Sequence, residues 1–86
     1  MSKEASEIGR QLRVDELHER TVVFISYEDR NVILTMWVSS IDGDVVAFYA
    51  GAINPPITFM TFRQPDGTLI DHNGKQVLVH EYLGEV

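Results

Sequence analysis

The chain has 86 residues, which predicts a single domain with no room for separate catalytic and regulatory lobes. Its composition of 44% hydrophobic and 23% charged residues is typical of a globular protein and excludes a disordered chain. The chain contains no Cys, so disulfides add nothing to the small core that a chain of this length buries.

The charge balance is acidic and argues against nucleic-acid binding. Thirteen acidic residues against seven basic ones give a formal net charge of -6. From Thr21 onward the basic residues are only Arg30, Arg63 and Lys75, too few for a basic stripe that would bind phosphates. We therefore expect no nucleic-acid partner.

No segment marks secretion or membrane insertion. The N-terminal residues lack an apolar run behind a basic start, and no stretch of about 18 uncharged apolar residues occurs. The absence of Cys agrees with a reducing compartment. We therefore expect a cytoplasmic protein with no membrane partner.

Residues 1–20 predict a helical N-terminal segment. Residues 3–20 are rich in charges of both signs and contain no Pro, with Gly9 as the one helix breaker. Their apolar positions do not form one continuous stripe. We expect a short helix over residues 3–13 with a second turn capped by Asp15; the alternative is one longer helix with a wide apolar face.

The rest of the chain, residues 21–86, predicts an antiparallel β-meander. Runs of β-branched and aromatic residues alternate with turn signals, which is typical of strands and hairpins. The six expected strands cover residues 21–27, 32–41, 44–53, 57–63, 68–72 and 75–83. The fold class is therefore α+β, with a short N-terminal helix and a strongly bent sheet of five or six strands. The alternative is an open roll with the helix packed on one face.

The turns between these strands carry specific signals. Asp42-Gly43 and Asn73-Gly74 predict two-residue hairpin loops with positive φ. Gln64-Pro65-Asp66-Gly67 fits a type I turn followed by a left-handed Gly in a bulge. Glu28–Asn31 is a weaker turn signal, and Asn54-Pro55-Pro56 predicts a break in pairing and a sharp bend.

The strands carry large apolar residues on both faces. A two-residue loop at Asp42-Gly43 places Ile41 opposite Asp44 and Trp37 opposite Phe48. The strand over residues 57–63 places Ile57 and Phe59 on one side and Met60 and Phe62 on the other. A half-solvated antiparallel strand alternates apolar and polar residues, so this pattern indicates that both faces are covered.

The expected helix covers only one face, with the small apolar set Ala5, Ile8 and Leu12, and barrel curvature covers the inside of the other. Outward-facing apolar residues remain. Hiding about 400 Å² of them per subunit is worth on the order of 10 kcal/mol before association entropy is subtracted. We therefore expect a homo-oligomer.

A helix followed by a bent meander of five or six strands resembles the element order of Sm-like proteins and other small SH3-type barrels. The resemblance implies a small closed barrel. Thr35 and Met36 stand where such a barrel often has a bending Gly, and the Asp and Asn of Sm-like RNA sites have no clear counterpart. RNA binding is therefore not carried over, and no family is assigned.

Candidate ligand or interface residues come from the aromatic strands, the proline corner and the last strand. They are Trp37, Phe48, Tyr49, Asn54, Pro55, Pro56, Phe59, Met60, Phe62, His80 and Tyr82. No catalytic residues, metal site or cofactor are predicted. His18, His72 and His80 lack metal-binding spacing, and the chain has no phosphate loop, nucleophile elbow or Cys nucleophile.

Three functions are compatible with these features. The first is a non-catalytic binding or assembly module that works as a homo-oligomer or with a protein partner. The second is an acidic inhibitor or nucleic-acid mimic that occupies a basic protein surface. The third is a small-molecule binding protein or small enzyme that uses an aromatic pocket near Tyr49 and Tyr82.

Overall fold

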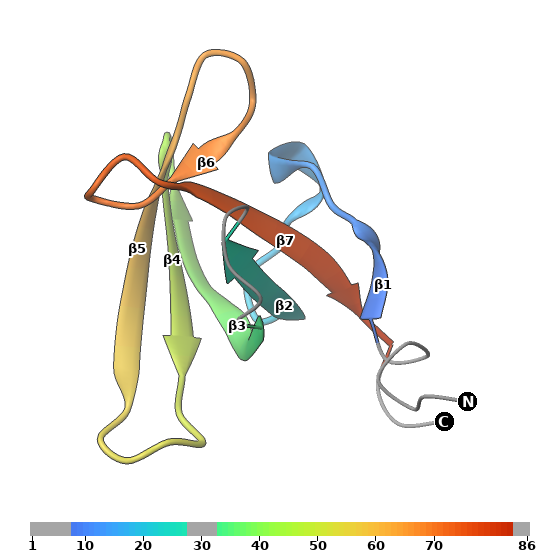
Figure 1. Cartoon of the computed structure of the whole chain (residues 1–86), viewed down its shortest axis with the longest axis vertical. Helices are drawn as coiled ribbons and strands as arrows, with labels where there is room; N and C mark the ends of the chain where they lie inside the picture. The colour runs from blue at the N-terminus through green and yellow to red at the C-terminus, as the bar shows by residue number, and fades with distance from the viewer. Residues whose placement is uncertain (1–7, 28–32, 84–86) are drawn as a thin grey trace.

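The computed structural model describes residues 8–27 and 33–83, which form one antiparallel sheet of seven strands closed into a barrel (Figure 1). The elements in chain order are β1 (Ile8–Gln11), the 3-10 helix η1 (Val14–Glu16), β2 (Val22–Tyr27), β3 (Ile33–Asp42), β4 (Val45–Ala50), β5 (Ile57–Arg63), β6 (Leu69–Ile70) and β7 (Gln76–Tyr82). Within these residues, no helix is long and apolar enough to cross a membrane.

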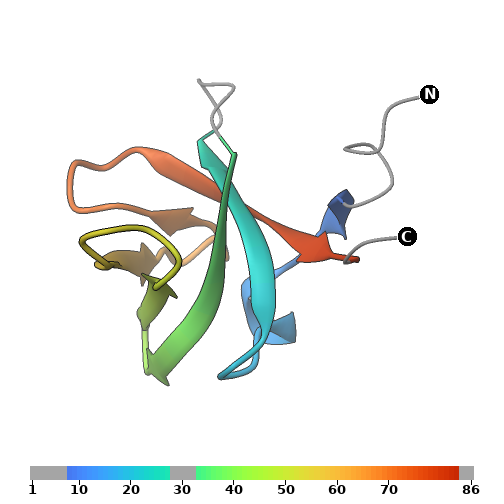
Figure 2. The same ribbon diagram turned by 90° about the horizontal axis from the view of Figure 1, so that it is seen from below.

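Strand β7 closes the barrel because both of its edges are paired. One edge pairs with β2, and the other pairs with β6 at Val77 and with β1 at His80. Strands β2 to β7 therefore form a six-stranded barrel, and β1 is an additional strand beside β6 on the same edge of β7. Figure 2 shows the strands curving around the interior.

The prediction of a bent antiparallel meander of six strands is confirmed. Strand β5 has the expected bounds, and the other five have shifted or shorter ends. Strand β4 ends at Ala50, three residues before its expected end, and residues 51–56 form an exposed loop to β5. The break in pairing at Asn54-Pro55-Pro56 is thus confirmed as a hairpin loop.

The helix predicted over residues 3–13 is wrong for the residues that the structure describes. Ile8–Gln11 form β1, and the one helical segment among the described N-terminal residues is η1. On this edge of β7, β6 pairs only as far as Val77, which leaves His80 and Tyr82 to pair with β1. This strand pairing stabilises residues 8–11 more than their local helix propensity does. Gly9 permits this approach, since a Cβ there would lie 2.5 Å from the Cβ of Glu81. Residues 1–7, including Ala5, lie outside the described residues.

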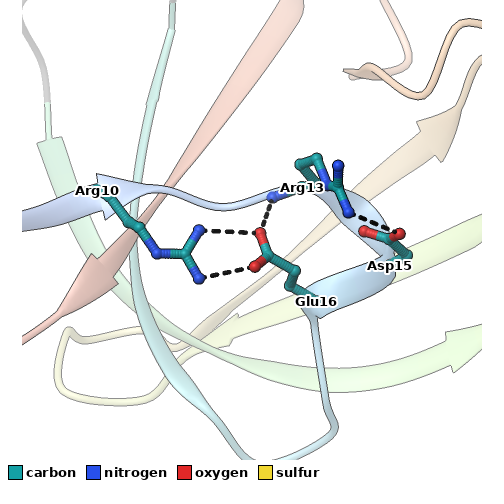
Figure 3. A network of polar contacts seen from close by, with 4 residues as sticks. All are labelled: Arg10, Arg13, Asp15 and Glu16. Carbon is teal, nitrogen blue, oxygen red and sulfur yellow. Dashed lines mark hydrogen bonds and ion pairs between the residues drawn. The ribbon is translucent and has the colours of Figure 1, made fainter.

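A polar network fixes η1 against β1 (Figure 3). The Arg10 guanidinium donates to Glu16 Oε1 at 3.1 Å and to Oε2 at 2.7 Å, and the Arg13 backbone N–H donates to Oε1 at 2.8 Å. These donors, Arg10 first, lower the pKa of Glu16 from 4.5 to about 2. Hydrogen bonding to Glu16 also raises the pKa of Arg10.

The barrel core is a single cluster of mainly aliphatic side chains. Its buried members are Leu17, Val23, Ile25, Met36, Val38, Val46, Phe48, Ala50, Leu69, Val77 and Val79. Leu17 follows η1 and packs into this cluster although it lies outside the strands. The segment that contains η1 therefore helps to cover the interior of the barrel.

The predicted type I turn between β5 and β6 is confirmed. The Gly67 N–H donates to the Gln64 carbonyl at 2.9 Å, and Gly67 has φ of 89°. Its left-handed conformation suits Gly because an L side chain would be strained there.

The two-residue loops predicted at Asp42-Gly43 and Asn73-Gly74 are wrong in position or length. Asp42 pairs with Val45, so the first loop is Gly43 and Asp44. The Asp71 N–H donates to the Lys75 carbonyl at 2.9 Å, which leaves a three-residue loop at the second site. Gly74 ends this loop in a left-handed conformation, with φ of 83°, as in a type I turn followed by a bulge. The turn expected at Glu28–Asn31 lies outside the described residues.

The register between β3 and β4 also differs from the expected one. Trp37 pairs with Tyr49 and Val38 pairs with Phe48, with a register shift between Val38 and Ser40. The predicted pairing of Trp37 with Phe48 is wrong for two reasons. The displaced loop alone would place Trp37 opposite Ala50, and the register shift moves its partner back by one residue to Tyr49. As a result Phe48 points into the core and Trp37 points outward.

Candidate functional site

An aromatic pair lies on the outside of the barrel, where the middle of β3 meets the end of β4. The rings of Trp37 and Tyr49 stack with centroids 5.6 Å apart and an interplanar angle of 23°. Their cross-strand pairing fixes this contact. Val22 on β2 pairs with Trp37, and Thr58 on β5 pairs with Tyr49, so one row crosses four strands.

Two further rows with apolar residues lie beside the first. Met60 pairs with Ala47, and Phe62 pairs with Val45. Trp37 is 48% exposed and Met60 is 42% exposed, while Ala47 between them is buried. Ala47 is therefore shielded by larger neighbours, while Trp37 and Met60 expose their own apolar surface to solvent.

The outer face, defined as the outward-facing residues of β2 to β5, has almost no charge. By strand register its members are Val22, Phe24, Ser26, Ile33, Thr35, Trp37, Ser40, Asp42, Val45, Ala47, Tyr49, Thr58, Met60 and Phe62. Asp42 at the end of β3 is the one acidic or basic residue among them. Depletion of charge together with aromatic residues and Met is the composition of interface centres.

Two of the other predicted site residues lie on β7, beside the outer face. His80 pairs with Phe24 of β2. The Tyr82 ring lies 5.1 Å from that of Phe24, which is only 8% exposed. Tyr82 therefore covers an outward-facing aromatic residue and borders the outer face.

The remaining predicted site residues lie elsewhere. Phe48 is fully buried in the core. Phe59 packs against the core and makes an edge contact with the Tyr27 ring at 6.1 Å. Asn54, Pro55 and Pro56 lie in the exposed β4–β5 loop, with a cis bond between Asn54 and Pro55. The structure thus brings together only part of the set proposed from the sequence.

Asp71 is a buried carboxylate that is not among the predicted site residues. Its Oδ1 accepts the backbone N–H groups of Asn73 and Lys75, both at 2.9 Å, and its Oδ2 accepts the Tyr27 hydroxyl at 2.8 Å. The Lys75 N–H contributes most to the lowered pKa of Asp71. The signal for this role is an Asp placed two residues before Asn-Gly, which is typical of Asx turns.

No three His, Asp or Glu side chains among the described residues are grouped to hold a metal ion. The geometry defines a small antiparallel β-barrel with a nearly uncharged, partly exposed outer face. Comparisons with protein-family models, curated proteins and solved structures find no match.

Proposed function

We propose that this protein is a non-catalytic assembly module that forms homo-oligomers through the outer face of β2 to β5. The observation that carries this proposal is the half-exposed Trp37, stacked on Tyr49 in a sheet surface whose one charged residue is Asp42. The proposed barrel type is SH3- or Sm-like, in line with the order of the strands.

A second copy of the chain is the partner that this face fits best. Each copy has a formal charge of -6, so two copies approach favourably only through surfaces without like charges. A two-fold axis would place the same apolar residues on both sides of the contact. A basic partner, as in the acidic-mimic alternative, would find no carboxylate on this face except Asp42.

The size of the outer face indicates a weak assembly. Four strands spaced by about 4.8 Å, with strands about 20 Å long, give roughly 400 Å² per subunit. Two such faces bury about 800 Å² in total, below the range of about 1,200 to 2,000 Å² for stable complexes. We therefore expect association at micromolar or higher concentrations.

Sedimentation velocity over a concentration series tests this proposal. Met60→Glu places a charge in the outer face at an exposed position. Ile53→Glu is the matched control, because Ile53 is 47% exposed but lies in the β4–β5 loop. Trp37 is the single Trp of the chain, so its fluorescence reports burial of the same surface.

The wild-type protein and Ile53→Glu should shift from monomer to a larger species with a blue shift of Trp emission as concentration rises. Met60→Glu should remain monomeric because desolvating the new carboxylate opposes association. A wild-type protein that stays monomeric up to several hundred micromolar would contradict the proposal. Equal association of Met60→Glu would also contradict it.

A further inference from the structure

A second surface feature is a cavity of about 430 Å³ between the segment that contains η1 and the turn from β5 to β6. Residues of the η1 segment, of the β5–β6 turn and of β7 all line this cavity. Apolar side chains form much of the cavity lining, among them Leu12, Val14, Leu69 and Val77. The volume is within the range of small-molecule sites, about 300 to 1,000 Å³.

Two carboxylates line this cavity, and both have partners. Asp15 forms an ion pair with Arg13 at 3.4 Å. Asp66 Oδ1 accepts the Thr68 hydroxyl at 2.7 Å and the Thr68 N–H at 3.0 Å. These bonds, the hydroxyl first, lower the pKa of Asp66, so it stays ionised. The acidic groups therefore do not leave an unsatisfied site for a cationic ligand.

Four charged residues line the cavity, and Arg63 is the one that has no partner among the described residues. It ends β5 two positions after the buried Thr61, on the same side of the strand, and it is exposed. No hydrogen bond or ion pair joins its guanidinium to any residue in the described part of the chain. An unpaired guanidinium beside a partly apolar cavity is an arrangement that suits an anionic ligand.

We propose that this cavity binds a small amphipathic carboxylate, with its carboxylate on Arg63 and its apolar chain against Leu12, Val14, Leu69 and Val77. A planar guanidinium binds a carboxylate through two parallel hydrogen bonds. The apolar side chains supply the hydrophobic part of the binding energy. No outer-face residue lines the cavity, so this proposal is independent of self-association.

Titration of ¹⁵N-labelled protein with octanoate tests the site by NMR. Octylammonium and octanol serve as probes with the same chain and a different head group. The variant Arg63→Gln removes the guanidinium, and Arg63→Lys keeps a positive charge. Arg20→Gln is the matched control, because it removes one positive charge at an exposed residue outside the cavity lining.

Octanoate should shift the amide signals of Leu12, Thr68 and Val77 and leave that of Trp37 unchanged. Arg63→Gln should weaken octanoate binding by about tenfold or more, since a charge-assisted pair is lost. Arg63→Lys should retain part of the affinity, and Arg20→Gln should retain all of it. Octanol should bind wild type and Arg63→Gln equally.

Three results would overturn the proposal. The first is no saturable shift at the cavity with millimolar octanoate. The second is equal octanoate affinity in wild type and Arg63→Gln. The third is binding of octylammonium as strong as that of octanoate, because Arg63 would then not select the head group.

Discussion

Individual polar residues stabilise this barrel where the strands end or cross. Asp71 joins the β6–β7 turn to β2, because the same carboxylate accepts from two turn N–H groups and from Tyr27. The Tyr27 ring in turn contacts Phe59 of β5. One buried carboxylate thus connects the β6–β7 loop to β2, which is distant in sequence.

We expect this carboxylate to contribute to acid sensitivity. The pKa of Asp71 is lower in the folded protein than its ordinary value of 3.8. Its stabilisation is therefore present above that value and lost as pH falls through the lower folded pKa. Asp71→Asn should lower the thermal midpoint at neutral pH and flatten its decline below about pH 4. Circular dichroism melts across pH would show this, and identical curves for both proteins would contradict it.

A buried hydroxyl gives a second prediction at this scale. Thr61 is fully buried, and its Oγ1 donates to the Val46 carbonyl at 2.8 Å. Thr61→Val keeps the shape and removes the donor, so the free energy of unfolding should fall by about 1 kcal/mol. Thr21→Val, at an exposed position outside the outer face, is the control and should change it by less than about 0.5 kcal/mol. Urea denaturation measures both free energies of unfolding. An unchanged value for Thr61→Val would show that the hydrogen bond from Thr61 to Val46 does not stabilise the fold.

At the scale of elements, the contact between β1 and η1 depends on a single carboxylate. Direct NMR titration of Glu16 should give a midpoint of about 2, because Arg10 and the Arg13 N–H stabilise the charged form. In Arg10→Gln the midpoint should move toward the ordinary value of 4.5. The added stability is present above that ordinary value and disappears as pH falls toward about 2. A midpoint near 4.5 in the wild type would show that Arg10 and Glu16 do not interact in solution.

The elements differ in how well sequence predicts them. Strand β5 and the turn at Gln64–Gly67 follow from local patterns, because alternation and turn chemistry act within a few residues. Strand β1 depends on the distant edge of β7, which no local pattern contains. The register of β3 on β4 depends on a loop displaced by one residue and on a bulge, and neither changes the apolar pattern.

The same distinction applies to the candidate site. Aromatic content points to Trp37 and Tyr49, but their stacking depends on the observed register. Phe48 has equal aromatic character and lies in the core, because neighbouring positions on a strand face opposite sides. In the sequence, Arg63 is one of only three basic residues after Thr21. Its place beside the cavity depends on closure of β6 onto β7 and on the position of η1.

At the scale of the whole molecule, small size links stability to assembly. A chain of 86 residues buries only about 60% of the surface of its unfolded form, so its stability as a monomer is marginal. Burial of the outer face in a dimer would add to this stability by mass action. Folding and association should therefore be coupled in the wild-type protein.

This coupling predicts a thermal midpoint that depends on protein concentration. Above the dissociation constant, a hundredfold rise in concentration should raise the midpoint by about 5 °C for a dimer of this chain length. Met60→Glu should show no such dependence, and Ile53→Glu should behave as the wild type. Differential scanning calorimetry at a fixed scan rate measures the midpoints. A midpoint independent of concentration in the wild type would mean that the exposed Trp37 surface adds nothing to stability through self-association.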